Sequence, residues 1–107
     1  MYTLSMDDRN ALREALSPTE DLIEEVKTAY SGRGMNGNTC FAIKTENPLQ
    51  VFGSLCTHLG EAGHYRLATK IFSEVSVDDL GFSKIIYFPH VKWGAEDVEF
   101  EEYEEDY

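Results

Sequence analysis

The chain of 107 residues has room for one domain with one hydrophobic core, and its 42% hydrophobic content argues against a protein that is unfolded throughout. The formal net charge of −11 is unevenly distributed, because residues 96–107 hold eight acids and no base, whereas residues 1–95 hold 12 acids and nine bases. Such a carboxyl end repels phosphate, so we expect neither direct nucleic-acid binding nor binding to an anionic membrane through it.

The sequence shows neither an export signal nor a membrane segment. No apolar run approaches the ~18 residues that a membrane span needs, and the first residues lack the basic and apolar regions of a secretion signal. The two cysteines, Cys40 and Cys56, form no CxxC motif and no dense disulfide framework. We therefore expect a cytoplasmic protein with reduced thiols.

The first expected elements are two helices. Ser5 followed by Asp8 resembles a capping box, and apolar residues at helical spacing behind it predict a helix over about 6–16. A second helix is expected from Ser17, which is a good N-cap residue and is followed by a proline suited to the first turn. We expect this helix to reach about residue 26, and the run 26–30 stays open between helix and strand.

A β-hairpin with a glycine-rich tip is expected next. Asn36-Gly37 is a strong signal for a two-residue turn, because both central positions of a type I′ turn need positive φ. Residues 39–45 then alternate as a strand does, and Gly32 and Gly34 fit bulges on the strand before the turn.

Two further helices and a strand follow. An asparagine–proline pair and the apolar spacing behind it predict a helix over about 48–60, and similar spacing predicts another over about 64–75. Residues 78–81 are typical of a turn. The β-rich run 84–88, which a proline ends, is predicted to be a buried strand.

Together these elements predict an α+β domain over residues 1–95 and an acidic C-terminal tail over residues 96–107. We expect a small three-stranded sheet with helices packed on one face. The helix pair between strands 39–45 and 83–88 is long enough for a crossover, so these two strands could be parallel. The order of the strands cannot be read from the sequence.

Residues 32–37 match the GxGxxG pattern of dinucleotide-binding loops. That motif needs a helix N-terminus after the glycines, so that amides reach the pyrophosphate, whereas a turn and a strand are expected here. We therefore interpret the segment as a hairpin tip whose Arg33 and Met35 contact a partner. A nucleotide-binding role stays open as the alternative.

No catalytic residue, metal site or cofactor is predicted. Cys56 and His58 lie two apart on one helix and point to nearly opposite sides, so they cannot reach one ion, and no paired spacing includes His64. His90 follows a strand and is the histidine best placed to line a cleft, but nothing marks a nucleophile for it to serve. We expect that the protein is not an enzyme.

The tail is the most distinctive feature of the sequence. It interleaves its acids with Phe100, Tyr103 and Tyr107, which a purely solubilising tail does not need, although a solvated tail without a partner stays open. An extended tail would present a line of charge, and a helical tail would present a stripe of rings. Either form would suit a basic groove built for a nucleic-acid backbone. The partner contacts that we predict are Arg33, Met35, Trp93 (the last large anchor of the domain), Glu96, Asp97, Glu99, Phe100, Glu101, Glu102, Tyr103, Glu104, Glu105 and Asp106.

The tail resembles, in character, the small acidic phage proteins that inhibit host enzymes by mimicking DNA. Its residues 101–105, Glu-Glu-Tyr-Glu-Glu, are similar to the Glu/Tyr-rich run that ends an anti-restriction mimic of this class. Residues 30–35, Tyr-Ser-Gly-Arg-Gly-Met, are similar to a stretch in small uncharacterised proteins of tailed phages. The resemblance implies a phage-encoded inhibitor that acts in the host cytoplasm.

Three functions are therefore weighed. The first is a phage-type inhibitor or modulator that binds the basic surface of a host nucleic-acid-binding protein through its own negative charge. The second is a regulatory binding module that acts through its folded body and the glycine-rich hairpin tip. The third is a small nucleotide-binding enzyme. The identity of the partner and the oligomeric state are not predicted.

Overall fold

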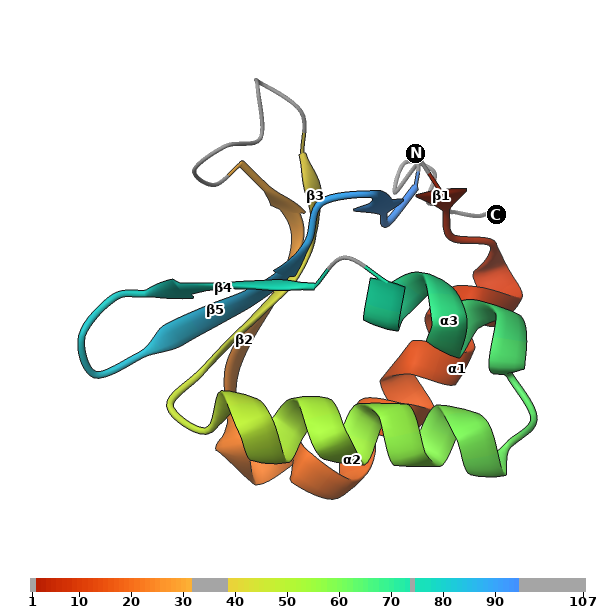
Figure 1. Ribbon diagram of the computed structural model, residues 1–107, viewed down its shortest axis with the longest axis horizontal. Coiled ribbons are helices and arrows are strands. Elements are labelled where there is room, and N and C mark those ends of the chain that lie inside the picture. The colour runs from red at the N-terminus through yellow and green to blue at the C-terminus, as the bar shows by residue number, and fades with distance from the viewer. Residues whose placement is uncertain (1, 32–38, 74, 95–107) are drawn as a thin grey trace, which may run out of the picture.

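Helices and two β-sheets form the part of the chain that the computed structural model describes, residues 2–31, 39–73 and 75–94. Figure 1 shows the α-helices gathered on one side of the larger sheet. The elements in chain order are β1 (Tyr2–Thr3), α1 (Met6–Leu16), the 3-10 helix η1 (Ser17–Leu22), β2 (Ile23–Tyr30), β3 (Cys40–Thr45), α2 (Pro48–Glu61), α3 (Tyr65–Ser73), β4 (Ser76–Asp79), β5 (Lys84–Phe88) and β6 (Val91–Lys92).

The α+β class is confirmed, but the expected single three-stranded sheet is wrong. The larger sheet has four strands in the order β2-β3-β5-β4, and each neighbouring pair is antiparallel. The unexpected strand is β4, whose Asp78 and Asp79 fall where the sequence predicts a turn; the turn lies just after them, where the Leu80 amide donates to the Ser83 carbonyl at 2.9 Å. Because the chain returns from α3 through β4, β5 runs antiparallel to β3, and the parallel alternative is also wrong.

A second sheet of two short strands ties the ends of the described chain together. β1 and β6 pair in parallel, the Tyr2 amide donates to the His90 carbonyl at 2.7 Å, and the Leu4 amide donates to the Lys92 carbonyl at 2.9 Å. The sequence does not reveal this sheet, because two residues are too few for an alternating pattern to show.

The three α-helices lie close to their predicted positions. At the start of α1, the Asp8 amide donates to Ser5 Oγ at 3.1 Å and the Ser5 amide donates to the Asp8 carboxylate at 3.3 Å, so the capping box is confirmed. α2 begins at Pro48, as its proline predicts. α3 ends at Ser73, slightly before the predicted residue 75.

The expected helix over 18–26 is wrong, because only the short η1 forms and β2 begins at Ile23. The proline of η1 suits the first turn of a helix, but Thr19 departs from helical geometry and Thr45 Oγ1 donates to the Leu22 carbonyl at 2.5 Å. Val26 then pairs with Ile43 of β3. Tertiary pairing therefore overrides the helical spacing at residues 23–25, and it decides for a strand at residues 26–30, where the sequence left helix and strand open.

A row of five aromatic rings crosses the core beneath the helices. Phe41 and Phe88 are register partners on β3 and β5 with ring centroids 5.4 Å apart, and Trp93 stacks on Phe41 at 5.3 Å. In the other direction, Phe52 lies 6.2 Å from Phe88 and 6.1 Å from Phe72. Phe72 is 65% exposed, whereas Phe41 is fully buried. The row thus runs from the surface at α3 to the centre of the domain and on to Trp93.

The other face of the larger sheet holds a smaller buried cluster, made of Cys40, Ala42, Ile85 and Tyr87. Tyr30 packs against it, with its ring centroid 5.5 Å from that of Tyr87. The expectation of helices on one face is therefore met, and the second face has its own apolar contacts.

On this face the Tyr30 hydroxyl of β2 donates a hydrogen bond to the Asp78 carboxylate of β4 at 2.5 Å. This hydrogen bond, with burial, raises the pKa of Tyr30 to about 12. Because the neutral phenol is the stabilised form, its contribution is present below the ordinary pKa near 10 and is lost as pH rises from about 10 to 12. We expect Tyr30→Phe to lower the free energy of unfolding by about 1 kcal/mol at neutral pH. Its unfolding curves should also lose part of the pH dependence between about 10 and 12. Tyr65→Phe, at a side chain 69% exposed, is the control and should change the free energy of unfolding at neutral pH by less than about 0.5 kcal/mol.

Gly94 closes the junction between β6 and the amino-terminal segment. It has φ of +105°, and a Cβ there would lie 2.7 Å from Arg9 Nη1, which donates to the Trp93 and Leu4 carbonyls at 2.9 and 3.2 Å. We expect Gly94→Ala to lower the free energy of unfolding by about 1–3 kcal/mol.

Gly53→Ala is the control, because Gly53 lies in an exposed part of α2 with open space around it. This variant should raise the free energy of unfolding by about 0.5–1 kcal/mol. Equal melting temperatures for the two variants would contradict this reading.

Candidate functional site

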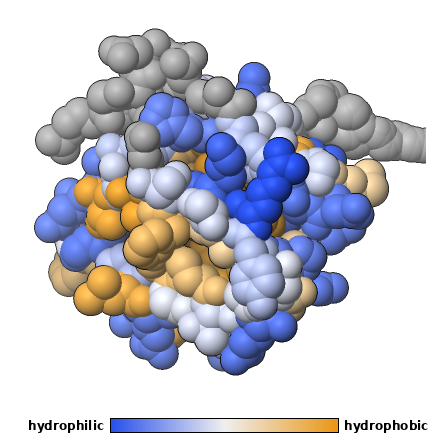
Figure 2. All heavy atoms as spheres, turned by 45° about the vertical axis from the view of Figure 1, so that its right-hand side comes forward, coloured by the Kyte–Doolittle hydropathy of each residue, from blue (hydrophilic) through white to orange (hydrophobic). Residues whose placement is uncertain are grey.

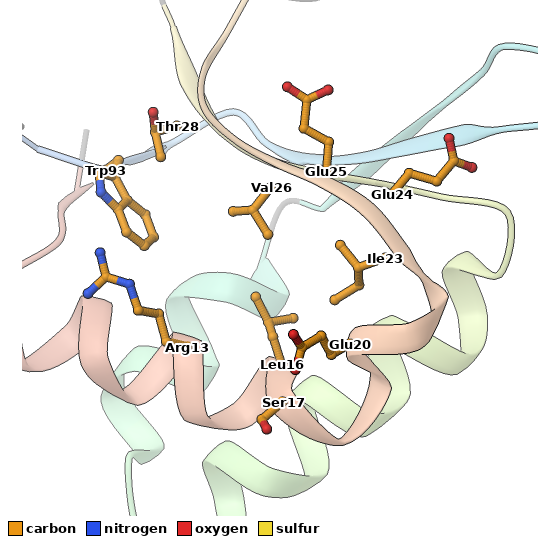
Figure 3. A pocket seen from close by; sticks show the side chains of 10 residues that line it. All are labelled: Arg13, Leu16, Ser17, Glu20, Ile23, Glu24, Glu25, Val26, Thr28 and Trp93. Carbon is orange, nitrogen blue, oxygen red and sulfur yellow. The ribbon is translucent and has the colours of Figure 1, made fainter.

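A groove of about 590 Å³ opens between α1 and β2 and ends at Trp93 (Figure 3). Its apolar floor is made by Leu16 of α1 together with Ile23 and Val26 of β2. Val26 pairs with the buried Ile43, so it points to the side of the sheet that the helices cover, yet it is 40% exposed. The groove exists because α1 packs on α2 and α2 packs on β3 and β5, which leaves the edge strand β2 only partly covered.

Trp93 and Arg13 form one end of the groove. The Trp93 ring stacks on Phe41, and the Arg13 guanidinium carbon lies 5.2 Å from the centroid of the indole ring. Arg13 Nη1 also donates to the Asn10 side chain at 3.2 Å. The Arg13 guanidinium is therefore already held by contacts within the protein.

Three carboxylates, Glu20, Glu24 and Glu25, line the groove along η1 and β2. Figure 3 shows Glu20 beside Leu16, and Glu24 and Glu25 pointing to the other side of β2. Glu24 accepts from Ser83 Oγ at 2.6 Å, and its other oxygen lies 3.9 Å from Lys44 Nζ. Glu25 pairs with Lys27 at 3.2 Å. Within residues 2–31, 39–73 and 75–94, Glu20 makes no ion pair. The groove therefore offers an apolar floor beside a carboxylate that has no ion pair with any residue the structure describes.

Of the predicted partner contacts, the structure describes Trp93 alone. Trp93 is 5% exposed, so most of its side chain packs in the core, and the remaining part lines the groove. Arg33, Met35 and the tail residues from 96 to 106 lie outside the described residues, and their roles stay predictions. The groove residues Arg13, Leu16 and Val26 were not predicted, because their meeting depends on β2 forming where the sequence left two alternatives.

Of the residues weighed for metal or nucleophilic chemistry, Cys40 lies on β3, Cys56 and His58 lie on α2, and His64 and His90 follow α2 and β5. The described part of the chain contains no group of three His, Cys, Asp or Glu side chains that could hold a metal ion. His58 Nδ1 lies 2.8 Å from the Ser54 carbonyl, one turn back on α2, and His58 and His64 line a separate cavity of about 120 Å³. Burial raises the pKa of the Cys40 and Cys56 thiols, which keeps them protonated and poorly nucleophilic.

No helix among the described residues combines the length and the apolar character that crossing a membrane requires. Comparison of the chain with protein-family models, with curated proteins and with solved structures finds no match in any of the three.

Proposed function

We propose that this protein binds a basic surface of another protein through its negative charge, as an inhibitor or modulator of a nucleic-acid-binding protein. The observation that carries the proposal is the placement of charge, with eight acids and no base in residues 96–107. A second acidic run, residues 14–26, has five acids and no base and passes along the groove. Clustered charge of one sign attracts an oppositely charged partner and suppresses binding to surfaces of like charge.

The class of partner follows from the same charge. Nucleic-acid enzymes carry basic channels that track a phosphate backbone, and a carboxylate-rich segment with interleaved rings offers both the charge and the stacking that such a channel accepts. The phage-type inhibitor suggested by the tail belongs to this proposal.

Affinity capture from the native host tests the proposal. The full-length protein, immobilised, should retain one or a few basic proteins, and deletion of residues 96–107 should abolish that retention. A circular-dichroism spectrum must show that the truncated protein keeps its fold. Equal retention of the same protein by both forms would overturn the proposal.

A second candidate is a binding module that acts through its folded body. It is favoured by large apolar side chains that lie exposed, because contiguous apolar surface marks interaction sites. Phe82 is 91% exposed and Leu80 is 55% exposed in the β4–β5 turn, and Leu49 is 88% exposed at the start of α2. Figure 2 also shows apolar side chains gathered on one side of the face that it draws. Loss of binding in Phe82→Ser or Arg33→Glu, with unchanged binding after tail deletion, would favour this candidate over the first.

A further inference from the structure

The groove between α1 and β2 reaches the outer edge of the sheet. Successive residues of a strand point to opposite faces, so a groove lined by both Glu25 and Val26 extends around the edge of β2. β2 is the terminal strand of the described sheet, with β3 as its one neighbour there. An edge strand leaves alternate backbone N–H and C=O groups free to pair with another extended chain.

The regular part of that edge is short. The register between β2 and β3 shifts between Ile23 and Glu25 and again between Lys27 and Tyr30, so an undisturbed ladder spans only residues 25–27. Bulges of this kind prevent long strands from adding to an edge. They leave room for a segment of about three residues to pair beside the groove.

The charge around the groove selects the occupant. Glu20, Glu24 and Glu25 line it, the Glu20 carboxylate has no ion-pair partner among the described residues, and Arg13 already lies on the Trp93 ring. An extended segment alternates its side chains between two directions, so every second residue can enter the apolar floor while its neighbours reach the carboxylates.

We propose that this groove binds a short extended segment of the partner protein in which lysine or arginine alternates with aliphatic residues. An aliphatic side chain packs on Leu16, Ile23 and Val26, and a basic side chain pairs with Glu20. The inference rests on the proposed function, because it names the segment of the basic partner that this site takes.

The test uses the full-length protein and a defined probe, the capped pentapeptide Lys-Val-Arg-Val-Lys. Methyl NMR signals of Val26, Ile23 and Leu16 report on the floor, and the fluorescence of Trp93, the single tryptophan, reports on the end of the groove. We expect the peptide to shift these signals. Two matched peptides, Lys-Ser-Arg-Ser-Lys and Glu-Val-Glu-Val-Glu, should leave them in place, because one lacks apolar side chains and the other lacks positive charge.

Variants then assign the contacts. Val26→Lys should weaken peptide binding at least about tenfold, because it places a long charged side chain on the floor. Glu20→Gln should weaken it about threefold and reduce its salt dependence. Val77→Lys is the matched control, since Val77 is a 53% exposed valine on the opposite edge strand β4, and it should bind as the wild type does.

Several results would overturn the inference. The first two are Val26 and Trp93 signals that the peptide does not shift, and peptide binding by Val26→Lys that equals binding by the wild type. The third is a Val26 signal that moves, in the absence of peptide, when the tail acids are changed to amides. The fourth is self-association of the protein that Val26→Lys removes. The last two would assign the groove to the tail of the same chain or to a second copy. If capture of a partner depends on the tail but the peptide does not bind, the groove inference is rejected and the proposed function stands. If the peptide binds but capture does not depend on the tail, the proposed function is rejected and the groove inference stands.

Discussion

Phe41→Ala is expected to lower the free energy of unfolding by about 3–5 kcal/mol. Phe41 is fully buried and stacks between Phe88 at 5.4 Å and Trp93 at 5.3 Å, so its removal leaves a cavity and breaks the row of rings on both sides. A domain of this size has a total stability of only about 5–15 kcal/mol. The melting temperature should therefore fall by about 10–20 °C.

The measurement is thermal unfolding followed by circular dichroism and by Trp93 fluorescence. Phe82→Ala is the matched control, because this side chain is 91% exposed, and its melting temperature should stay within a few degrees of the wild type. An equal loss of stability in the two variants would show that the core is not organised around Phe41.

Replacing the eight acids of residues 96–107 by their amides, Glu by Gln and Asp by Asn, is expected to weaken binding to the partner about 100-fold or more. The replacement preserves the length and the size of each side chain while removing all the side-chain charge of the tail. Because clustered charge both steers association and pairs with basic groups at contact, its loss should act on the rate and on the affinity.

The control for this variant removes charge from elsewhere on the full-length chain. Asp7, Glu46 and Glu61 are exposed, lie outside the acidic run 14–26 and do not line the groove. Their conversion to amides should change the affinity by less than about threefold. An equal loss of affinity in both variants would show that net charge matters and the tail as such does not. The dissociation constants can be measured by calorimetry with the captured partner.

The helices could be predicted because local signals specify their ends. The capping residues Ser5 and Asp8 act within one turn, and the proline at the start of α2 fixes a backbone angle that suits a helix. Such interactions depend on neighbours in the sequence, so the sequence contains them in full.

The strands depend on partners far along the chain, and here the prediction failed in part. β4 includes Asp78 and Asp79 of the run 78–81, which is typical of a turn, and forms a strand because Val77 pairs with Ile86 and Asp78 pairs with Ile85. β2 replaces the expected helix because Val26 pairs with Ile43.

The candidate site could not be predicted for the same reason, because it depends on contacts between residues that are far apart in the sequence. The groove brings Arg13, Glu20 and Val26, from the consecutive elements α1, η1 and β2, close to the distant Trp93, and none of these residues belongs to a motif. Trp93 was predicted from its position as the last large anchor of the domain. That Glu20 has no ion pair within the described ranges could be identified only once its surroundings were known.

The association rate constant of the full-length protein with its partner, measured across ionic strength, tests the central claim most directly. If the concentrated negative charge recruits a basic surface, the rate constant should fall at least about tenfold between roughly 20 and 500 mM salt, because the Debye length shortens from about 20 Å to about 4 Å. A rate constant that stays constant over this range would contradict the account, since it would show that the charge of the chain does not guide the encounter.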